Sequence, residues 1–195
     1  LMTKKISAIV FFIFLLNANL HAIEPDVFVQ STVNRASKLL SENIDKDQKI
    51  KELKDIAKET VDIRGIGYYS LGPIRKTLNE EQLKKYSSLF EQYFLKSFSS
   101  RLAEYTNPEI DVYNKEVLDK NYTIVNSVLK ATNERPEIKI DWRIYTKDPT
   151  NPLIRDLIIE GLSLARTQKE EFLSVLNSNN SDINALFETL QKFNN

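Results

Sequence analysis

The stretch Glu137-Ile-Lys-Ile-Asp-Trp-Arg-Ile-Tyr-Thr146 alternates between apolar and charged side chains from one residue to the next. Successive side chains of a β-strand point to opposite faces of a sheet, so this period predicts a strand with one covered face and one wet face. Three further runs rich in β-branched residues, 109–118, 121–132 and 153–165, are separated by short turn signals. Four consecutive strands with short connections predict an antiparallel meander.

Helical periodicity marks the chain on both sides of these strands. Asn79 and Gln82 have the spacing of a capping box ahead of the longest periodic run, and Thr167 and Ser181 are expected to open the two helices that follow the strands. The predicted helices cover residues 24–44, 63–71, 79–105, 167–176 and 181–190, and the charged segment 45–60 is expected to be a solvated helix or an ordered connector. The fold class predicted is therefore α+β, a twisted four-stranded antiparallel sheet covered on one face by helices.

The first residues have the layout of a secretory signal peptide. Lys4 and Lys5 precede an uncharged apolar run from Ile6 to Leu16, and Leu20-His-Ala22 follows it. That run is shorter than the roughly 20 residues that a helix needs to cross a bilayer. We therefore expect residues 1–22 to be a signal peptide that is removed on export to the periplasm, and residues 23–195 to form a single domain.

Composition excludes several classes of function. Without residues 1–22 the chain keeps 25 basic and 27 acidic side chains, a balance that argues against nucleic-acid binding. It has no cysteine, and His21 lies in the segment expected to be removed, so Ser-His and Cys-His pairs and Cys/His zinc sites are excluded. Carboxylate, Ser-Lys and Tyr chemistry stay open. Asp156 and Glu160 could form a hydrolase pair in principle, but a solvated strand edge is the preferred interpretation.

Three local patterns lie between residues 61 and 190. They are Asp62 with the apolar helix that ends at Leu71-Gly72 and the following Arg75; the Glu81-Gln82 helix opening that runs through Phe90, Phe94 and Tyr105; and the stretch Asp156-Leu-Ile-Ile-Glu-Gly-Leu-Ser-Leu164 followed by Phe172. Together with the order of elements, they resemble the Mla periplasmic phospholipid-binding family, also called the MlaC or toluene-tolerance family. The chain departs from the family pattern at Pro152, where a Trp is usual, and at Gln168-Lys169, where a Tyr-Arg pair is usual.

The resemblance implies a monomeric phospholipid carrier with no catalytic residue, metal or cofactor. Its implied partners are an outer-membrane lipoprotein complex and an inner-membrane ABC transporter bearing an MCE-domain protein, and its implied role is to maintain outer-membrane lipid asymmetry. A lipid with on the order of 30 methylenes at ~0.8 kcal/mol each must have its tails shielded from water. Its headgroup can stay in water and needs no dedicated polar site.

An apolar lipid cavity is expected between the sheet and the helices. The residues expected to line it are Ile66, Tyr69, Tyr93, Phe94, Phe98, Val125, Ile140, Trp142, Leu157 and Ile159. Trp142 fits an ordinary core position equally well. Gly65 and Gly67 weaken a short helix, so their presence needs an explanation. Close packing of this helix against its neighbours is preferred as the explanation over an approach of the backbone to a bound acyl chain. The alternative function is a periplasmic chaperone or lipoprotein carrier with an apolar groove, which would hold no stoichiometric phospholipid.

Overall fold

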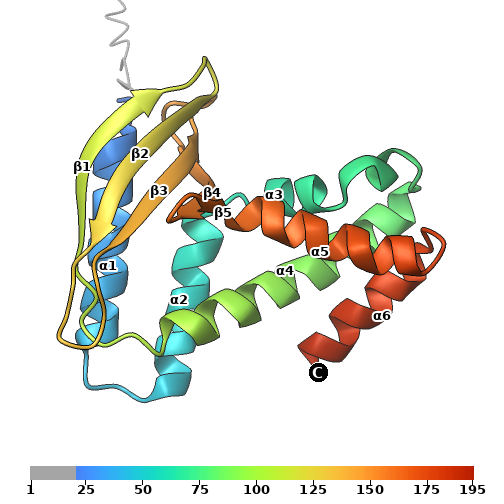
Figure 1. The fold of residues 1–195 in the computed structure, drawn as a ribbon, viewed down its shortest axis with the longest axis horizontal. Coiled ribbons are helices and arrows are strands. Elements are labelled where there is room, and N and C mark those ends of the chain that lie inside the picture. The colour runs from blue at the N-terminus through green and yellow to red at the C-terminus, as the bar shows by residue number, and fades with distance from the viewer. Residues whose placement is uncertain (1–20) are drawn as a thin grey trace, which may run out of the picture.

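The computed structural model describes residues 21–195, so the greater part of the expected signal peptide lies outside the described residues. Figure 1 shows the elements in chain order. They are α1 (Pro25–Ser41), α2 (Lys46–Thr60), α3 (Ile63–Ser70), the 3-10 helix η1 (Gly72–Lys76), α4 (Glu80–Leu102), β1 (Ile110–Val117), β2 (Tyr122–Leu129), β3 (Ile138–Tyr145), β4 (Leu153–Ile159), β5 (Leu162–Ser163), α5 (Leu164–Ser178) and α6 (Ile183–Asn194). The predicted fold class is confirmed, with one strand more than expected.

The first four helices begin close to where the sequence predicts. Asn79 accepts a hydrogen bond from the Gln82 amide, and the Gln82 side chain accepts one from the Asn79 amide, which completes the capping box of α4. Asp45 caps α2 and Asp62 caps α3 in the same manner, each accepting from a backbone N–H three residues later. These side chains satisfy amides that have no partner within the helix.

The sheet is a fully antiparallel meander in the order β1-β2-β3-β4-β5. The expected fourth strand breaks at Glu160 and Gly161, whose φ angles of 49° and 83° are both positive. Two consecutive positive φ angles are typical of a type I′ hairpin turn, and the chain returns as β5. Ser163 therefore caps α5, and the expected helix start at Thr167 is wrong. The expected cap Ser181 is also wrong, by one residue, because Asp182 caps α6.

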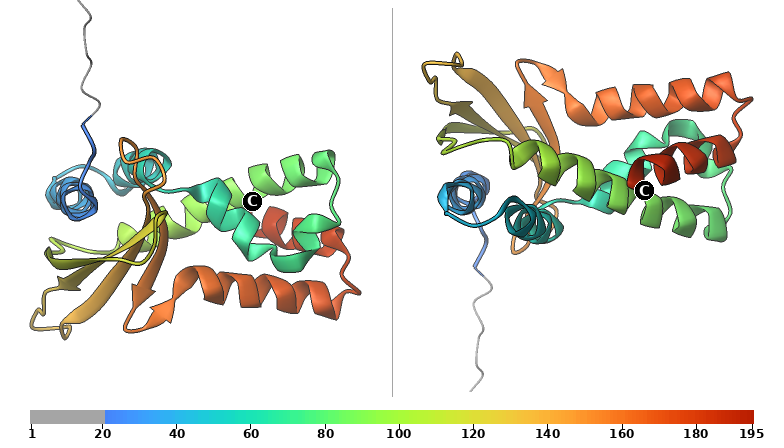
Figure 2. Two further views of the ribbon diagram at one scale, coloured as in Figure 1. Left: turned by 90° about the horizontal axis from the view of Figure 1, so that it is seen from above. Right: turned by 90° about the horizontal axis from the view of Figure 1, so that it is seen from below.

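The helices form two groups around the sheet. Helix α1 packs on β1 and β2, whereas α3 and α5 pack on β4. Figure 2 shows α1 and α2 standing side by side next to the sheet, with α5 running away from it beside α3, α4 and α6. Helix α4 connects the groups because it packs on α2 as well as on α3 and α6. Among residues 21–195, no helix is both long and apolar enough to span a membrane.

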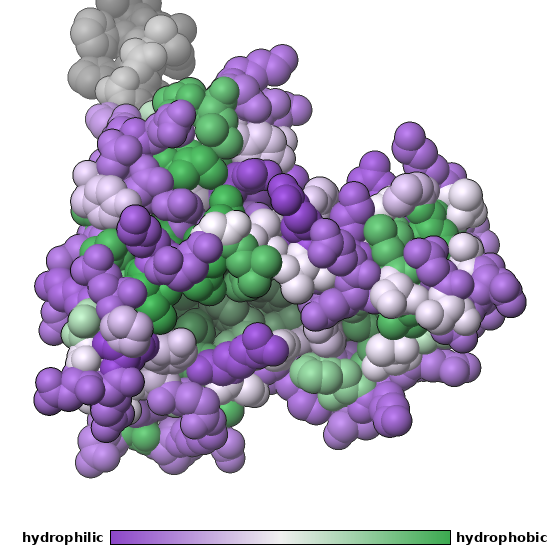
Figure 3. Space-filling view, viewed as in Figure 1, coloured by the Kyte–Doolittle hydropathy of each residue, from purple (hydrophilic) through white to green (hydrophobic). Residues whose placement is uncertain are grey.

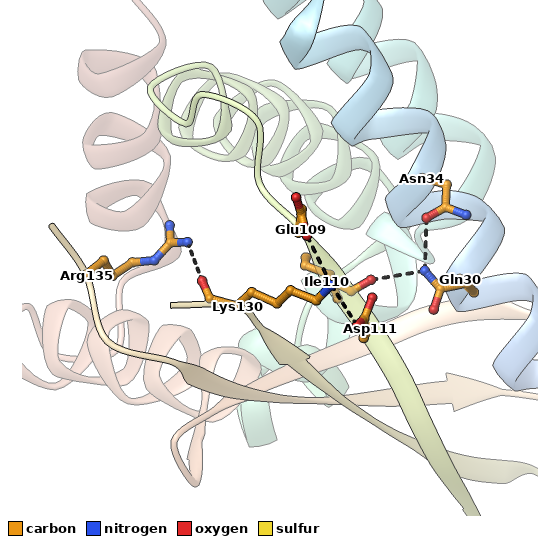
Figure 4. Close-up of polar contacts among 7 residues, drawn as sticks. All are labelled: Gln30, Asn34, Glu109, Ile110, Asp111, Lys130 and Arg135. Atoms are coloured by element: carbon orange, nitrogen blue, oxygen red, sulfur yellow. Dashed lines mark hydrogen bonds and ion pairs between the residues drawn. The ribbon is translucent and has the colours of Figure 1, made fainter. Parts of the chain in front are cut away.

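Polar side chains close the outer edge of β1. The Gln30 amide of α1 donates to the Ile110 carbonyl at 3.0 Å and accepts from the Val112 amide at 2.9 Å, which satisfies strand groups that face no further strand. Figure 4 shows the hydrogen bond from Gln30 to Ile110 together with Lys130. The Lys130 ammonium lies 3.0 Å from a Glu109 oxygen and 3.1 Å from an Asp111 oxygen. The edge of the sheet is thus held against α1.

The main core joins the covered face of the sheet to the helices. On β3, Ile140, Trp142 and Ile144 are buried while Lys139 and Arg143 are exposed, as the alternation predicts. Other buried members of this core include Val29, Val33, Ile66, Tyr86, Phe90, Phe172, Leu176, Leu186 and Phe187, which come from α1, α3, α4, α5 and α6. A smaller second cluster, Leu39, Leu40, Leu53 and Ile56, holds α1 to α2.

Candidate functional site

A cavity of about 220 Å³ lies where α4, the β3–β4 part of the sheet and the start of α5 meet. Figure 3 shows the surface hollowed in this region, between the sheet and the outer helices, with apolar residues at the floor. Its residues are Val61, Ile66, Phe90, Tyr93, Phe94, Ser97, Phe98, Arg101, Trp142, Ile154, Arg155, Asp156, Leu157, Leu164, Ala165, Thr167, Gln168 and Glu171. The cavity is therefore mainly apolar, with polar groups contributed by α4, β4 and α5.

The wall that α4 contributes is aromatic. Its cavity residues recur every three or four positions from Phe90 to Arg101, which places them on one face of the helix. The rings of Phe94 and Phe98 are stacked with centroids 5.6 Å apart and 12° between their planes, and Phe90 lies 6.1 Å from Phe94. Three consecutive turns of α4 therefore present a continuous ring surface to the cavity.

The opposite wall combines Trp142 of β3 with Ile154 and Leu157 of β4. The indole N–H of Trp142 donates to the Ser127 hydroxyl at 2.8 Å, and that hydroxyl donates to the Ile140 carbonyl at 2.8 Å. Because its polar atom is satisfied inside the sheet layer, the Trp142 ring can act as an apolar surface.

A chain of hydrogen bonds links the aromatic wall to α5. The Tyr93 hydroxyl donates to Gln168 Oε1 at 2.8 Å, and Gln168 Nε2 donates to Glu171 at 3.1 Å. Burial is the largest cause that raises the pKa of Tyr93, and the Glu171 charge raises it further, whereas the hydrogen bond between Tyr93 and Gln168 and the Arg101 charge lower it. Arg101 and Glu171 thus both act electrostatically on this hydroxyl.

The model of the MlaC family, described as MlaC protein, matches residues 29–192. This chain belongs to the MlaC family. Its fold is similar to the solved structure of a phospholipid-binding protein from Ralstonia solanacearum in complex with a phospholipid, with a TM-score of 0.74 at 18% identity. That likeness covers 88% of this chain and 97% of the other, and at this identity it shows the fold alone. No curated protein matches the sequence.

The cavity of this MlaC-family chain brings together part of the set predicted from the sequence. Ile66, Tyr93, Phe94, Phe98, Trp142 and Leu157 line it. Val125 and Ile140 lie in the core, and Ile159 pairs with Ile140 away from the cavity. Tyr69 is 46% exposed, and the Lys169 ammonium lies 5.1 Å from its ring centroid. Val125, Ile140, Ile159 and Tyr69 therefore share a sheet face or a helix with lining residues but do not line the cavity themselves. A lipid contact by any of the ten residues stays a prediction.

The polar residues of the cavity were missed. Ser97 and Arg101 follow Phe94 by three and seven residues, so the helical period that identified Phe94 and Phe98 also places them on the same face. Thr167, Gln168 and Glu171 come from the start of α5, which the wrong helix boundary obscured. An apolar search pattern cannot find such residues.

Asp62 and Arg155 join α3 to β4 beside the cavity. Arg155 donates from Nε to Asp62 and from its Nη1 to the Tyr122 hydroxyl at 3.0 Å, and its guanidinium lies 4.6 Å from the Tyr145 ring centroid. A Cβ added to Gly65 would stand 2.4 Å from Asp62 Oδ2 and 2.6 Å from Arg155 Nε. Close packing is therefore confirmed as the reason for glycine at this position.

The second glycine of α3 has an apolar neighbour. A Cβ on Gly67 would stand 2.7 Å from Cδ1 of Phe90, and the Gly67 carbonyl accepts the Tyr86 hydroxyl at 3.0 Å. Close packing is confirmed here as well, because α3 and α4 approach too tightly for a side chain.

Asp156 and Glu160 both hold backbone in place. Asp156 is only 6% exposed and accepts the Ser163 hydroxyl at 2.5 Å and the Ala165 amide at 2.9 Å, so the expected solvated strand edge is wrong for this residue. Glu160 is exposed and accepts the Lys139 amide at 2.5 Å. Asp156 was misplaced because the sequence did not reveal the turn that brings α5 back over β4. In the part of the chain from residue 21 onward, no three His, Cys, Asp or Glu side chains are grouped to hold a metal.

Proposed function

We propose that this protein is a periplasmic phospholipid carrier whose cavity between α4, β4 and α5 sheathes acyl chains. The observation that carries the proposal is the aromatic face of α4, which meets the apolar residues of β3 and β4 across a cavity. Membership of the MlaC family supports it, and so does the likeness of fold to a protein solved with a phospholipid. The carrier moves lipid between an outer-membrane lipoprotein complex and an inner-membrane ABC transporter bearing an MCE-domain protein, and so maintains lipid asymmetry.

The cavity must widen to take a two-chain lipid. Sites for drug-sized ligands occupy roughly 300–1,000 Å³. The cavity here is about 220 Å³, smaller than that range, and a phospholipid is larger than most drugs. We infer that lipid entry separates the α4 wall from the β4–α5 wall, with partner complexes at each membrane promoting the open form.

The carrier proposal involves no covalent step. Two buried or partly buried acidic groups in this region have structural partners: Asp62 pairs with Arg155, and Asp156 holds the start of α5. Residues 1–22 are proposed to direct export and to be removed. The Ile23 amide donates to the Pro149 carbonyl at 2.8 Å, which ties the start of the proposed mature domain to its β3–β4 connection.

The test is native mass spectrometry of the protein purified from the periplasm without detergent, followed by lipid analysis of the same sample. A one-to-one diacyl phospholipid adduct on a chain that begins at Ile23 is expected. Bare protein, under conditions in which a known lipid carrier keeps its cargo, would overturn the proposal in favour of a chaperone or lipoprotein carrier.

A matched pair of variants locates the cargo. Ser97→Trp places an indole in the cavity, whereas Ser88→Trp adds the same group at an exposed position of the same helix outside it. The first variant is expected to lose the adduct while remaining folded, and the second to keep it. Equal lipid content in the two variants would place the lipid elsewhere.

A further inference from the structure

Two arginines line the cavity, and they differ in how their charges are used. Arg155 is paired with Asp62, bonded to Tyr122 and stacked on Tyr145. Arg101, in the last turn of α4, is exposed and forms no ion pair or side-chain hydrogen bond with any residue between 21 and 195. Arg101 therefore borders both the cavity and solvent, at the cavity mouth, and no described side chain occupies the five donors of its guanidinium.

A carboxylate reaches the same mouth from the other wall. Glu171 of α5 is exposed and lines the cavity, and its described side-chain partner is the uncharged Gln168 amide of its own helix. Arg101 and Glu171 form no ion pair with each other, yet they shift the pKa of Tyr93 in opposite directions. The mouth therefore holds one positive and one negative group, one on each wall, within electrostatic reach of a common hydroxyl.

We propose that Arg101 and Glu171 form a headgroup site that selects zwitterionic phospholipids. This site rests on the proposed function, because tails held in the cavity bring the headgroup to its mouth. The Arg101 guanidinium binds the phosphate, which a planar fork of donors can contact through two oxygens. The Glu171 carboxylate binds the ammonium group that ethanolamine or choline carries beyond the phosphate.

The same geometry disfavours an anionic headgroup. Phosphatidylglycerol offers a phosphate to Arg101 but no cation to Glu171, so the Glu171 carboxylate stays without a cationic partner and repels the phosphate. Selectivity should therefore depend mainly on Glu171, and overall retention mainly on Arg101. Both effects weaken at high salt because the groups are exposed.

The test uses vesicles of equimolar phosphatidylethanolamine and phosphatidylglycerol with identical acyl chains. The mature protein is incubated with them and separated, and its bound lipid is quantified by native mass spectrometry. Wild type is expected to load mainly phosphatidylethanolamine. Glu171→Gln should shift the ratio toward phosphatidylglycerol by several-fold, and Arg101→Gln should lower loading from both lipids, with Arg101→Lys in between because lysine lacks the fork.

Substitutions that remove the same charge from nearby residues serve as controls. Glu170→Gln and Arg166→Gln alter exposed residues of α5 outside the cavity and should leave the ratio unchanged. A Glu171→Gln ratio equal to that of wild type overturns the headgroup site while leaving the carrier intact. Failure of wild type to load either lipid would instead overturn the carrier proposal and this site with it.

Discussion

The two halves of α4 carry the same apolar stripe into different surroundings. In the first half, Tyr86 and Phe90 are 0% and 1% exposed and pack against α3 and Phe172 of α5, and of these two only Phe90 borders the cavity. In the second half, Phe94 and Phe98 are only partly buried and face the cavity. A periodic stripe thus predicts which face of a helix turns inward, but not whether that face meets other side chains or a space for cargo.

The largest expected effect comes from preventing the second half from moving. The chain has no cysteine, so Ser97→Cys with Leu157→Cys provides two unique thiols on opposite cavity walls. Joining them with a short bismaleimide should nearly abolish lipid exchange with vesicles while leaving bound lipid in place. The Ser97→Cys single variant, treated identically, is the control. Unimpaired exchange in the cross-linked protein would show that widening does not occur between these walls.

The next largest effect is a difference in unfolding free energy between substitutions in the two halves of α4. Phe90→Ala removes a ring that is 1% exposed and packed against α3 and Phe172, and should lower the free energy of unfolding by about 3–5 kcal/mol. Phe98→Ala removes a ring that already faces a cavity and should cost only about 1–2 kcal/mol. Urea unfolding of the lipid-free proteins measures both. Similar losses at the two positions would mean that the cavity wall is packed like the core.

A smaller effect tests the contact that seals the first half. Gly67→Ala improves helix propensity by about 1 kcal/mol, but its Cβ meets Phe90 at 2.7 Å. Moving the buried Phe90 ring aside would disrupt its packing, so a net loss of about 1–3 kcal/mol is expected from thermal unfolding. A variant more stable than wild type would show that Phe90 has room to move.

The smallest effect is a pH dependence at the boundary of the halves. Burial is the main cause that raises the pKa of both Tyr86 and Tyr93, which keeps each phenol neutral in the folded protein to higher pH than in the unfolded chain. Their contribution is complete below about pH 10 and is lost as the pH rises further, because the unfolded chain releases these protons first.

Removing either phenol group should reduce the loss of folding stability at alkaline pH. Denaturant midpoints between pH 8 and 11 should fall less steeply for Tyr86→Phe than for wild type, with a weaker change for the half-buried Tyr93→Phe. At neutral pH the variants should cost about 1–2 and about 0.5–1 kcal/mol, respectively, through their lost hydrogen bonds. Equal slopes for wild type and both variants would contradict the assignment.

Most of the fold was predictable because it depends on local patterns. The capping box at Asn79 and the alternation around Trp142 are written into a few neighbouring residues, and both elements form where expected. Gly161 within the expected fourth strand indicates a bulge or bend, but a glutamate at positive φ gives no local signal of a full hairpin turn, so the return as β5 and the start of α5 were not predicted.

The candidate site was less predictable than the fold. Phe94 and Phe98 could be placed on an inward face, but the distinction between them and Val125 depends on how separate elements leave space between them. The helical period places Arg101 on the face of Phe94 and Phe98, but a search for apolar residues passes over Arg101 and Glu171 because both are charged. Their proximity results from a helix–helix arrangement that connects residues 70 positions apart.

The tight return from β4 through β5 into α5 has a consequence for how the chain folds. Its contacts, including those from Asp156 to Ser163 and Ala165, join residues fewer than ten positions apart. Short loops close at little entropic cost, so we expect this segment to order early and α4 to dock onto it later. Pulsed hydrogen exchange should then protect residues 156–165 before 94–101, and simultaneous protection would refute that order. A folding chain would accordingly pass through a state with one wall formed and the other absent, in which a lipid could enter without the widening that we propose for the folded protein.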